Sequence, residues 1–144
     1  MEDNQRHDLL DNWLSIINVQ TNIADKLESA LEEKYSLSLK EFYVLYFLSQ
    51  TDDKQLRLQQ LQEMIGLSQS AISRLVGRME ANSCGALERH LCEDDRRGIY
   101  TRLTSLGEEK FKKALVTFEE ILQFILAEGH LQGAWQSFLD KSQQ

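Results

Sequence analysis

The sequence lacks proline altogether and has only two cysteines and three histidines among its 144 residues. It contains no low-complexity tract and no internal repeat of roughly 20 to 50 residues, which excludes a solenoid. Cys84 and Cys92 are too few for a disulfide framework and are not spaced as Cys-x-x-Cys, so we expect reduced thiols. A redox switch between them is the alternative, but neither thiol has a clear cluster of basic residues around it.

The sequence also lacks a catalytic or metal-binding motif. His7, His90 and His130 lie far apart, no nucleophile signature surrounds any of them, and there is no glycine-rich phosphate loop. His90 and Cys92 lie two residues apart on one strand face, but two ligands do not make a zinc site, so His90 is expected at the surface. We therefore predict a protein that is not an enzyme and that uses no metal or cofactor.

No apolar run is long enough to cross a bilayer. The longest helical candidate, residues 103–127, carries seven Glu and Lys side chains. The N-terminus is polar and acidic and lacks the basic start and apolar stretch of a secretory signal, so a cytoplasmic location is expected. Hydrophobic residues make up 42% and charged residues 27%, as in soluble globular proteins, and the length suits one domain.

The net charge of −7 taken alone argues against a nucleic-acid partner. The charges are unevenly distributed, however, because residues 57–102 carry seven arginines, no lysine and six acidic residues, while the flanks are strongly acidic. Arginine forms planar, two-pronged hydrogen bonds to phosphates and guanine edges that lysine cannot reproduce. The central segment is therefore a candidate for recognition of nucleic acid.

Apolar residues at spacings of three and four predict a chain that is mainly α-helical. Ser38 and Glu41 have the spacing of a capping box, Gly66 is expected to end a helix, and Ser68 is expected to cap the next one. Short strands are expected around a turn with a charged tip at 93–98. The expected helices are 8–33, 39–50, 58–65, 69–80, a long one after Thr104 and 131–139, and the strand-like runs are 56–58, 86–92 and 99–104.

The order of helix, turn, capped helix and two-stranded ribbon is that of a winged helix-turn-helix. One side of the fourth helix is polar, and could be no more than the solvated face of an amphipathic helix. The ribbon favours a second interpretation, because a polar helix face can read base edges in the major groove while Arg96 and Arg97 reach the minor groove. The residues on or beside the polar stripe are Gln69, Ser70, Ser73, Arg74 and Arg78.

The stretches 67–80, 87–89 and 95–107 resemble the recognition helix and wing of the MarR/SlyA family of transcription regulators. As in that family, the wing ends in an Asp-Arg pair, here Asp95 and Arg96. A strand follows, and then a glycine, Gly107, that opens a long helix. The resemblance implies a homodimer built from 8–33 and 104–142, a DNA-binding region at 38–103, and a repressor released from an inverted-repeat operator by a small ligand. The implied DNA contacts are Ser68, Gln69, Ser70, Ser73, Arg74, Arg78, Asp95, Arg96 and Arg97.

The sequence departs from the family pattern at Thr101, where leucine is commonest, at Gln62, where a small alanine often packs, and in a longer linker at 82–85. Thr101 is a tolerable strand residue, and Gln62 indicates a looser or differently arranged contact between the third and fourth helices. A winged-helix module that binds protein instead of DNA is the main alternative, and the acidic net charge favours it.

Two further expectations concern the helices outside the DNA-binding region. An apolar stripe on the last long helix, together with the apolar first helix, exceeds what one small winged domain can cover and predicts dimerisation. An aromatic or apolar effector is expected between the long helices and the winged domain. The stripe is Phe111, Leu115, Phe118, Leu122 and Ile125, and the candidate effector residues are Trp13, Tyr35, Tyr43 and Tyr46.

Overall fold

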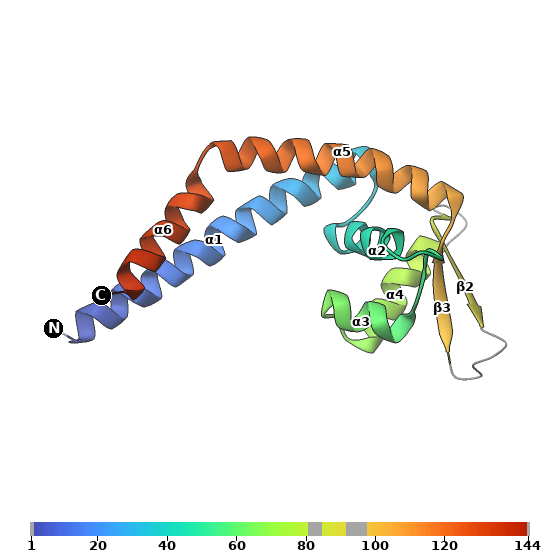
Figure 1. Ribbon diagram of the computed structural model, residues 1–144, viewed down its shortest axis with the longest axis horizontal. Coiled ribbons are helices and arrows are strands. Elements are labelled where there is room, and N and C mark those ends of the chain that lie inside the picture. Colours follow the sequence, from blue (N-terminus) through green and yellow to red (C-terminus); the bar gives the residue numbers. More distant parts are fainter. Residues whose placement is uncertain (1, 81–84, 92–97, 144) are drawn as a thin grey trace.

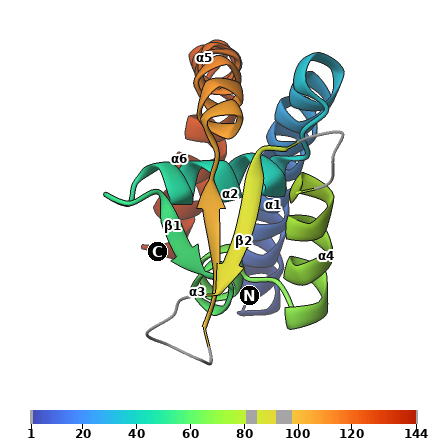
Figure 2. The same cartoon turned by 90° about the vertical axis from the view of Figure 1, so that its right-hand side faces the viewer.

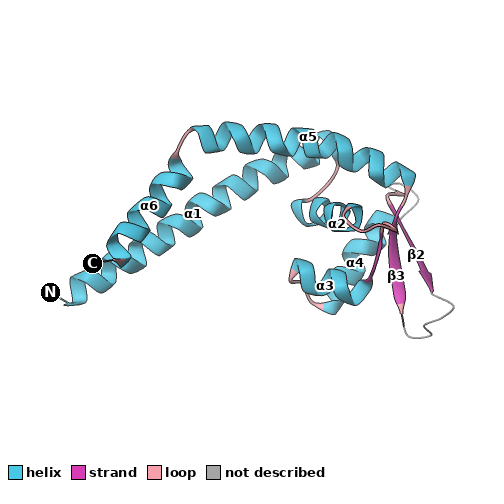
Figure 3. Cartoon of the chain, viewed as in Figure 1, coloured by secondary structure: helices cyan, strands magenta, loops and turns pink. Residues whose placement is uncertain are grey.

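The computed structural model describes residues 2–80, 85–91 and 98–143, which form a mainly helical fold with one small sheet (Figure 1). Helices α1, α5 and α6 form an elongated arm, and α2, α3, α4 and the sheet form a head beneath one end of α5 (Figure 3). This architecture confirms the expected fold class. The elements are α1 (Glu2–Tyr35), α2 (Leu39–Ser49), β1 (Gln55–Arg57), α3 (Leu58–Ile65), α4 (Gln69–Glu80), β2 (Leu87–Leu91), β3 (Ile99–Leu103), α5 (Ser105–Ala127) and α6 (His130–Ser142).

A short joint connects α1 of the arm to α2 of the head. Ser36 lies in the left-handed region, with a φ of 55°, and so ends α1. The predicted capping box is present, since the Ser38 hydroxyl accepts from the Glu41 amide at 3.1 Å and Glu41 Oε1 accepts from the Ser38 amide at 2.9 Å. Glu28 of α1 also accepts from the Leu39 amide at 3.2 Å, so a carboxylate of the arm caps the first helix of the head.

The turn between α3 and α4 forms as the sequence predicts. Gly66 has a φ of 78°, a conformation that side-chain-bearing residues rarely adopt, and its amide donates to the Gln62 carbonyl at 2.9 Å. The Leu67 amide donates to the same carbonyl at 3.3 Å. The Ser68 hydroxyl then accepts from the Ala71 amide at 3.2 Å and caps α4.

The sheet has three antiparallel strands in the order β1-β3-β2, so the expected two-stranded ribbon was too small. Thr101 of β3 is paired with Leu56 on one side and Arg89 on the other. The first strand is Gln55–Arg57 and not 56–58, because Leu58 already begins α3. Thr101 is fully buried, and its hydroxyl has no hydrogen-bond partner among the described residues.

The core fills the space between α2, α3, α4 and α5. Phe42 of α2 stacks on Phe118 of α5, with ring centroids 4.8 Å apart, and lies 5.5 Å from Phe111. The α5 stripe expected at a dimer interface is instead packed against the chain's own core, so that interpretation was wrong. The large apolar side chains that remain exposed on the arm are Leu9, Leu10, Trp13, Leu14, Ile17, Leu106, Val116, Phe124, Trp135 and Leu139.

Several helix boundaries differ from those expected. α1 begins at Glu2 instead of residue 8, and α6 runs from His130 to Ser142, because polar residues continue a helix without contributing to its apolar period. Gly107 allows α5 to start against the head, since a Cβ there would overlap the Ala86 carbonyl. Within the described ranges, no helix combines the length and apolarity required to span a membrane.

We predict that Gly66→Ala lowers the free energy of unfolding by about 1 to 2 kcal/mol, the usual cost of a left-handed alanine. No atom lies within 4 Å of the position of the added Cβ, so backbone strain is the only expected cause. Gly133→Ala is the matched control, because Gly133 is also in open space but inside a helix with no positive φ. Urea unfolding should show this second variant unchanged or stabilised by up to about 1 kcal/mol; destabilisation of both variants alike would contradict the assignment.

Candidate nucleic-acid interface

The outer face of α4 is held in position by its inner face. Ile72, Leu75, Val76 and Met79 are buried against the head, which fixes how the helix is rotated. The opposite side is exposed. Figure 2 shows that α4 lies beside the sheet, on the side of β2. The predicted contact residues that are exposed there are Ser68, Gln69, Ser70, Arg74 and Arg78.

The predicted residues of α4 do not all have the same freedom to contact a partner. The Ser68 hydroxyl is engaged in capping the helix, and it also lies 3.4 Å from the Ser70 hydroxyl. Arg74 Nε donates to the Ser70 carbonyl at 3.3 Å, so its guanidinium group lies along the helix. Ser73 is only partly exposed, and its carbonyl accepts from Arg89 Nη2 at 3.0 Å. The backbone of Ser73 is therefore bound by a side chain of the sheet.

A polar link that the sequence analysis missed joins the sheet to α4. Arg89 of β2 donates through Nε to Glu80 at the end of α4 and through Nη2 to the Ser73 carbonyl. The guanidinium passes over Gly77, where the helix has no side chain. The two charged side chains are 30% and 26% exposed, so solvent screens the pair only in part. We call Arg89, Glu80 and the Ser73 carbonyl the strut.

The outer face of the sheet carries a stack of three side chains. Arg57 Nε donates to the Tyr100 hydroxyl at 3.1 Å, with its guanidinium carbon 5.6 Å from the ring centroid. His90 stacks on Tyr100 at 5.8 Å and is exposed, which confirms its predicted surface position. These three residues lie on three different strands, and they become neighbours only when the strands pair. Local spacing in the sequence therefore does not predict their contact.

Asp95, Arg96 and Arg97 lie outside the described residues, as do Cys84 and Cys92, so the wing contacts and the redox alternative stay predictions. In the described ranges, no group of three or more His, Cys, Asp or Glu side chains is arranged to hold a metal ion.

An apolar groove of 570 Å³ lies between α2, α3 and α5. Tyr43 and Tyr46 line it as expected, together with Phe47 and Met64, and burial raises the pKa of the Tyr43 phenol, with a contribution from Glu28. The other two candidate residues lie elsewhere, which corrects the expectation. Trp13 packs against Phe138 of α6, and Tyr35 bonds to Thr117 and to the Lys113 carbonyl.

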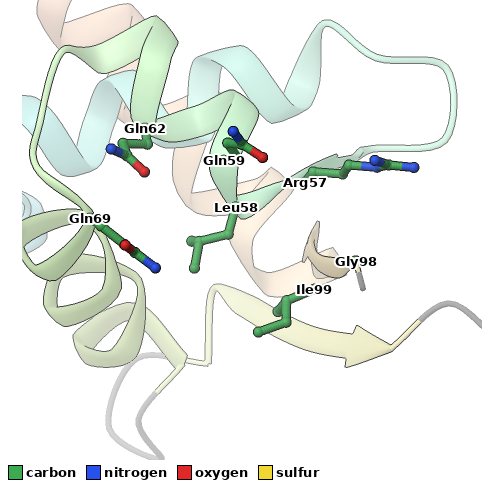
Figure 4. Close-up of a pocket in the computed structure, with 7 residues that line it drawn as sticks. All are labelled: Arg57, Leu58, Gln59, Gln62, Gln69, Gly98 and Ile99. Atoms are coloured by element: carbon green, nitrogen blue, oxygen red, sulfur yellow. The ribbon is translucent and has the colours of Figure 1, made fainter. Parts of the chain in front are cut away.

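A second, polar groove of 660 Å³ lies where α3, the start of α4 and the beginning of β3 meet (Figure 4). Gln62, which was expected to loosen the contact between α3 and α4, is half-buried at this groove. The residues that line it are Arg57, Leu58, Gln59, Gln62, Gln69, Gly98 and Ile99. We call it the wing-root groove.

Comparison with known proteins places this geometry in a family. Residues 26–114 match the family model described as transcriptional regulator SarA/Rot. The fold is similar to that of AbsC, a MarR family transcriptional regulator from Streptomyces coelicolor, with a TM-score of 0.74 and 26% identity over 81% of this chain and 76% of AbsC. No curated protein is significantly similar in sequence.

Two further solved structures share the fold. Sco3205, a MarR family regulator from the same organism solved in complex with DNA, has a TM-score of 0.75 and 24% identity over 81% of this chain and 71% of its own. The organohalide-sensing regulator RdhR, solved with 2,4-dichlorophenol, has a TM-score of 0.68 and 21% identity over 80% of this chain and 66% of its own. The expected MarR-type fold is thus confirmed.

We predict that the strut contributes to stability as a pair. A double-mutant cycle with Arg89→Ala and Glu80→Ala should give a coupling energy of about 1 kcal/mol in urea unfolding, because the pair is partly shielded from water. The control cycle is Arg102→Ala with Glu88→Ala, an ion pair at 3.9 Å whose side chains are 56% and 57% exposed. That pair should couple by less than about 0.5 kcal/mol, and equal coupling in the two cycles would refute the distinction.

Proposed function

The chain belongs to the SarA/Rot family of transcriptional regulators, and from this we propose that it binds duplex DNA as a homodimer and represses transcription at an inverted-repeat operator. The observation that carries the proposal is the exposed arginine face of α4, with Arg74 and Arg78 one turn apart beside the sheet. A helix held in this way can enter the major groove with its polar side toward the base edges. The DNA complex of Sco3205 supports this use of the fold.

The proposed contacts divide into two groups. Arg74, near the middle of α4, would contact a base edge, while Arg78 in the last turn would contact a phosphate. Asp95, Arg96 and Arg97 complete the proposal as minor-groove contacts of the wing, in which the carboxylate orients a guanidinium. Ser68 serves the reading helix by capping it.

The homodimer is proposed from the apolar surface of the arm. Leu9, Leu10, Trp13 and Phe138 line a shallow apolar depression of 350 Å³ where α1 and α6 pack together. Exposure of this apolar surface to water is unfavourable. Contact with the same surface of a second copy of the chain would bury it. Two heads related by a twofold axis would then match an inverted repeat.

The effector is proposed to be a small aromatic molecule in the apolar groove. Residues of α2 and α3 in the head and of α5 in the arm line the groove. A bound ligand would therefore change the position of the head relative to the arm. Lys40 lines it too and could pair with an acidic group of such a ligand. The dichlorophenol complex of RdhR supports an aromatic ligand on this fold.

Selection of bound sequences from a randomised duplex library tests DNA binding directly. Enrichment of an inverted repeat is expected; no enrichment, together with no salt-sensitive binding, would favour the protein-interaction module instead. On the selected duplex, Arg74→Ala should cost about 1 to 3 kcal/mol and relax sequence preference. Arg78→Ala should weaken binding to the selected duplex and to random duplexes equally. It should also reduce the slope of log affinity against log salt concentration by about 1, as measured by mobility-shift titration.

The dimer is tested by a pair of equally exposed leucines. Leu10→Glu, at a residue that is 56% exposed in the arm depression, should shift the chain toward monomer because a carboxylate would be buried. Leu106→Glu, at 55% exposure in the first turn of α5 beside the head, should leave the dimer intact. Sedimentation equilibrium distinguishes the two results. A parent chain that stays monomeric at micromolar concentration would remove the twofold operator from the proposal.

A further inference from the structure

The wing-root groove is lined by polar side chains, but by no carboxylate among the described residues. None of the seven described residues that line it is acidic, although the chain has 23 Asp and Glu residues. The groove beside β3 and α5 contains Glu88 and Glu108, and the apolar groove contains Glu119. Arg57 lies at one side of the wing-root groove, held by Tyr100. An anion can therefore occupy this groove without facing a carboxylate from the described part of its lining.

The glutamines of α3 are divided between two roles. Gln60 is engaged within the helix, since its Oε1 accepts from the Arg57 amide at 2.9 Å and caps the first turn. Gln59 and Gln62 line the groove instead. Figure 4 shows the side chains of Gln62 on α3 and Gln69 on α4 at one side of the groove, with Leu58 beside them and Ile99 beyond Leu58. The groove thus combines amide donors with apolar walls.

The position of the groove limits what can fill it once α4 enters a major groove. In a helix-turn-helix the first helix of the pair crosses the DNA backbone, and here that helix is α3. The wing-root groove lies between α4 and the beginning of β3. In duplex DNA the sugar–phosphate backbone separates the major groove from the minor groove. Amide N–H groups bond phosphate oxygens, and apolar side chains can contact the carbon atoms of the sugars.

We propose that the wing-root groove seats the sugar–phosphate backbone of DNA, with Gln59 and Gln62 donating to phosphate oxygens and Leu58 and Ile99 contacting the sugars. The inference rests on the proposed DNA binding and adds residues to it. Neutral amides release no counterions when they bind phosphate, so they add affinity without changing its salt dependence. Residue 62 is glutamine in this chain, where the family pattern often has alanine. The glutamine then gives this acidic protein an additional contact to the DNA backbone.

The test measures affinity against salt concentration on the selected duplex and on a random-sequence duplex. Gln62→Ala should weaken binding to both by about threefold to tenfold, the value of one neutral hydrogen bond, with the salt slope unchanged. Gln59→Lys should bind both more tightly and steepen the slope by about 0.9, because it adds one phosphate-neutralising charge. Gln50→Lys is the matched control, since it makes the same charge change at an exposed residue that ends α2 and does not line the groove.

The outcomes separate this inference from the function on which it rests. Equal slopes for Gln59→Lys and Gln50→Lys, or parent-like affinity of Gln62→Ala, would overturn the backbone seat even if Arg74→Ala loses specificity. A parent protein that binds neither duplex would overturn both proposals. Alanine is a strong helix former, so Gln62→Ala should keep its helical circular dichroism, and a lost affinity can then be attributed to the missing amide.

Discussion

The packing of α4 on the head is the constraint on which the other features depend. Four apolar side chains of this helix are buried, and they determine which residues face outward, where the turn at Gly66 must lie and how β2 can return along the helix. A helix that rotated by one residue would turn about 100° and would bury its arginines. The strut adds a second restraint, because it ties the end of α4 to the sheet through charged groups.

The distribution of charge reconciles an acidic protein with a proposed polyanionic partner. The net charge is −7, so nonspecific attraction to DNA from a distance is weak. Affinity must then come from groups placed within hydrogen-bonding distance, and the head supplies both arginines and neutral amides for this purpose. A regulator built in this way would discriminate more by fit than by general attraction, which reduces its occupancy of unrelated sequences.

The sequence predicted the features that depend on neighbouring residues. The capping box at Ser38, the turn at Gly66 and the exposed stripe of α4 follow from local spacing, and all are present. It predicted a strand-like run at 56–58, but not that this run pairs as a third strand of the sheet, since its partner segment lies more than forty positions away. The strut could not be predicted either, because Arg89 and Glu80 lie on different elements. The spacing of the α5 stripe shows that one face is apolar, but it does not show which part of the molecule covers that face.

The joint between α1 and α2 has a mechanical consequence. α1 has 34 residues and is therefore about 50 Å long, and the chain passes from it to the head through a single left-handed serine and a cap that a carboxylate of α1 helps to form. A rod of that length amplifies small rotations, since a tilt of about 5° at one end moves the other end by about 4 Å. A small change of packing beside Ser36 would therefore displace the far end of α1 by a distance comparable to a base-pair step.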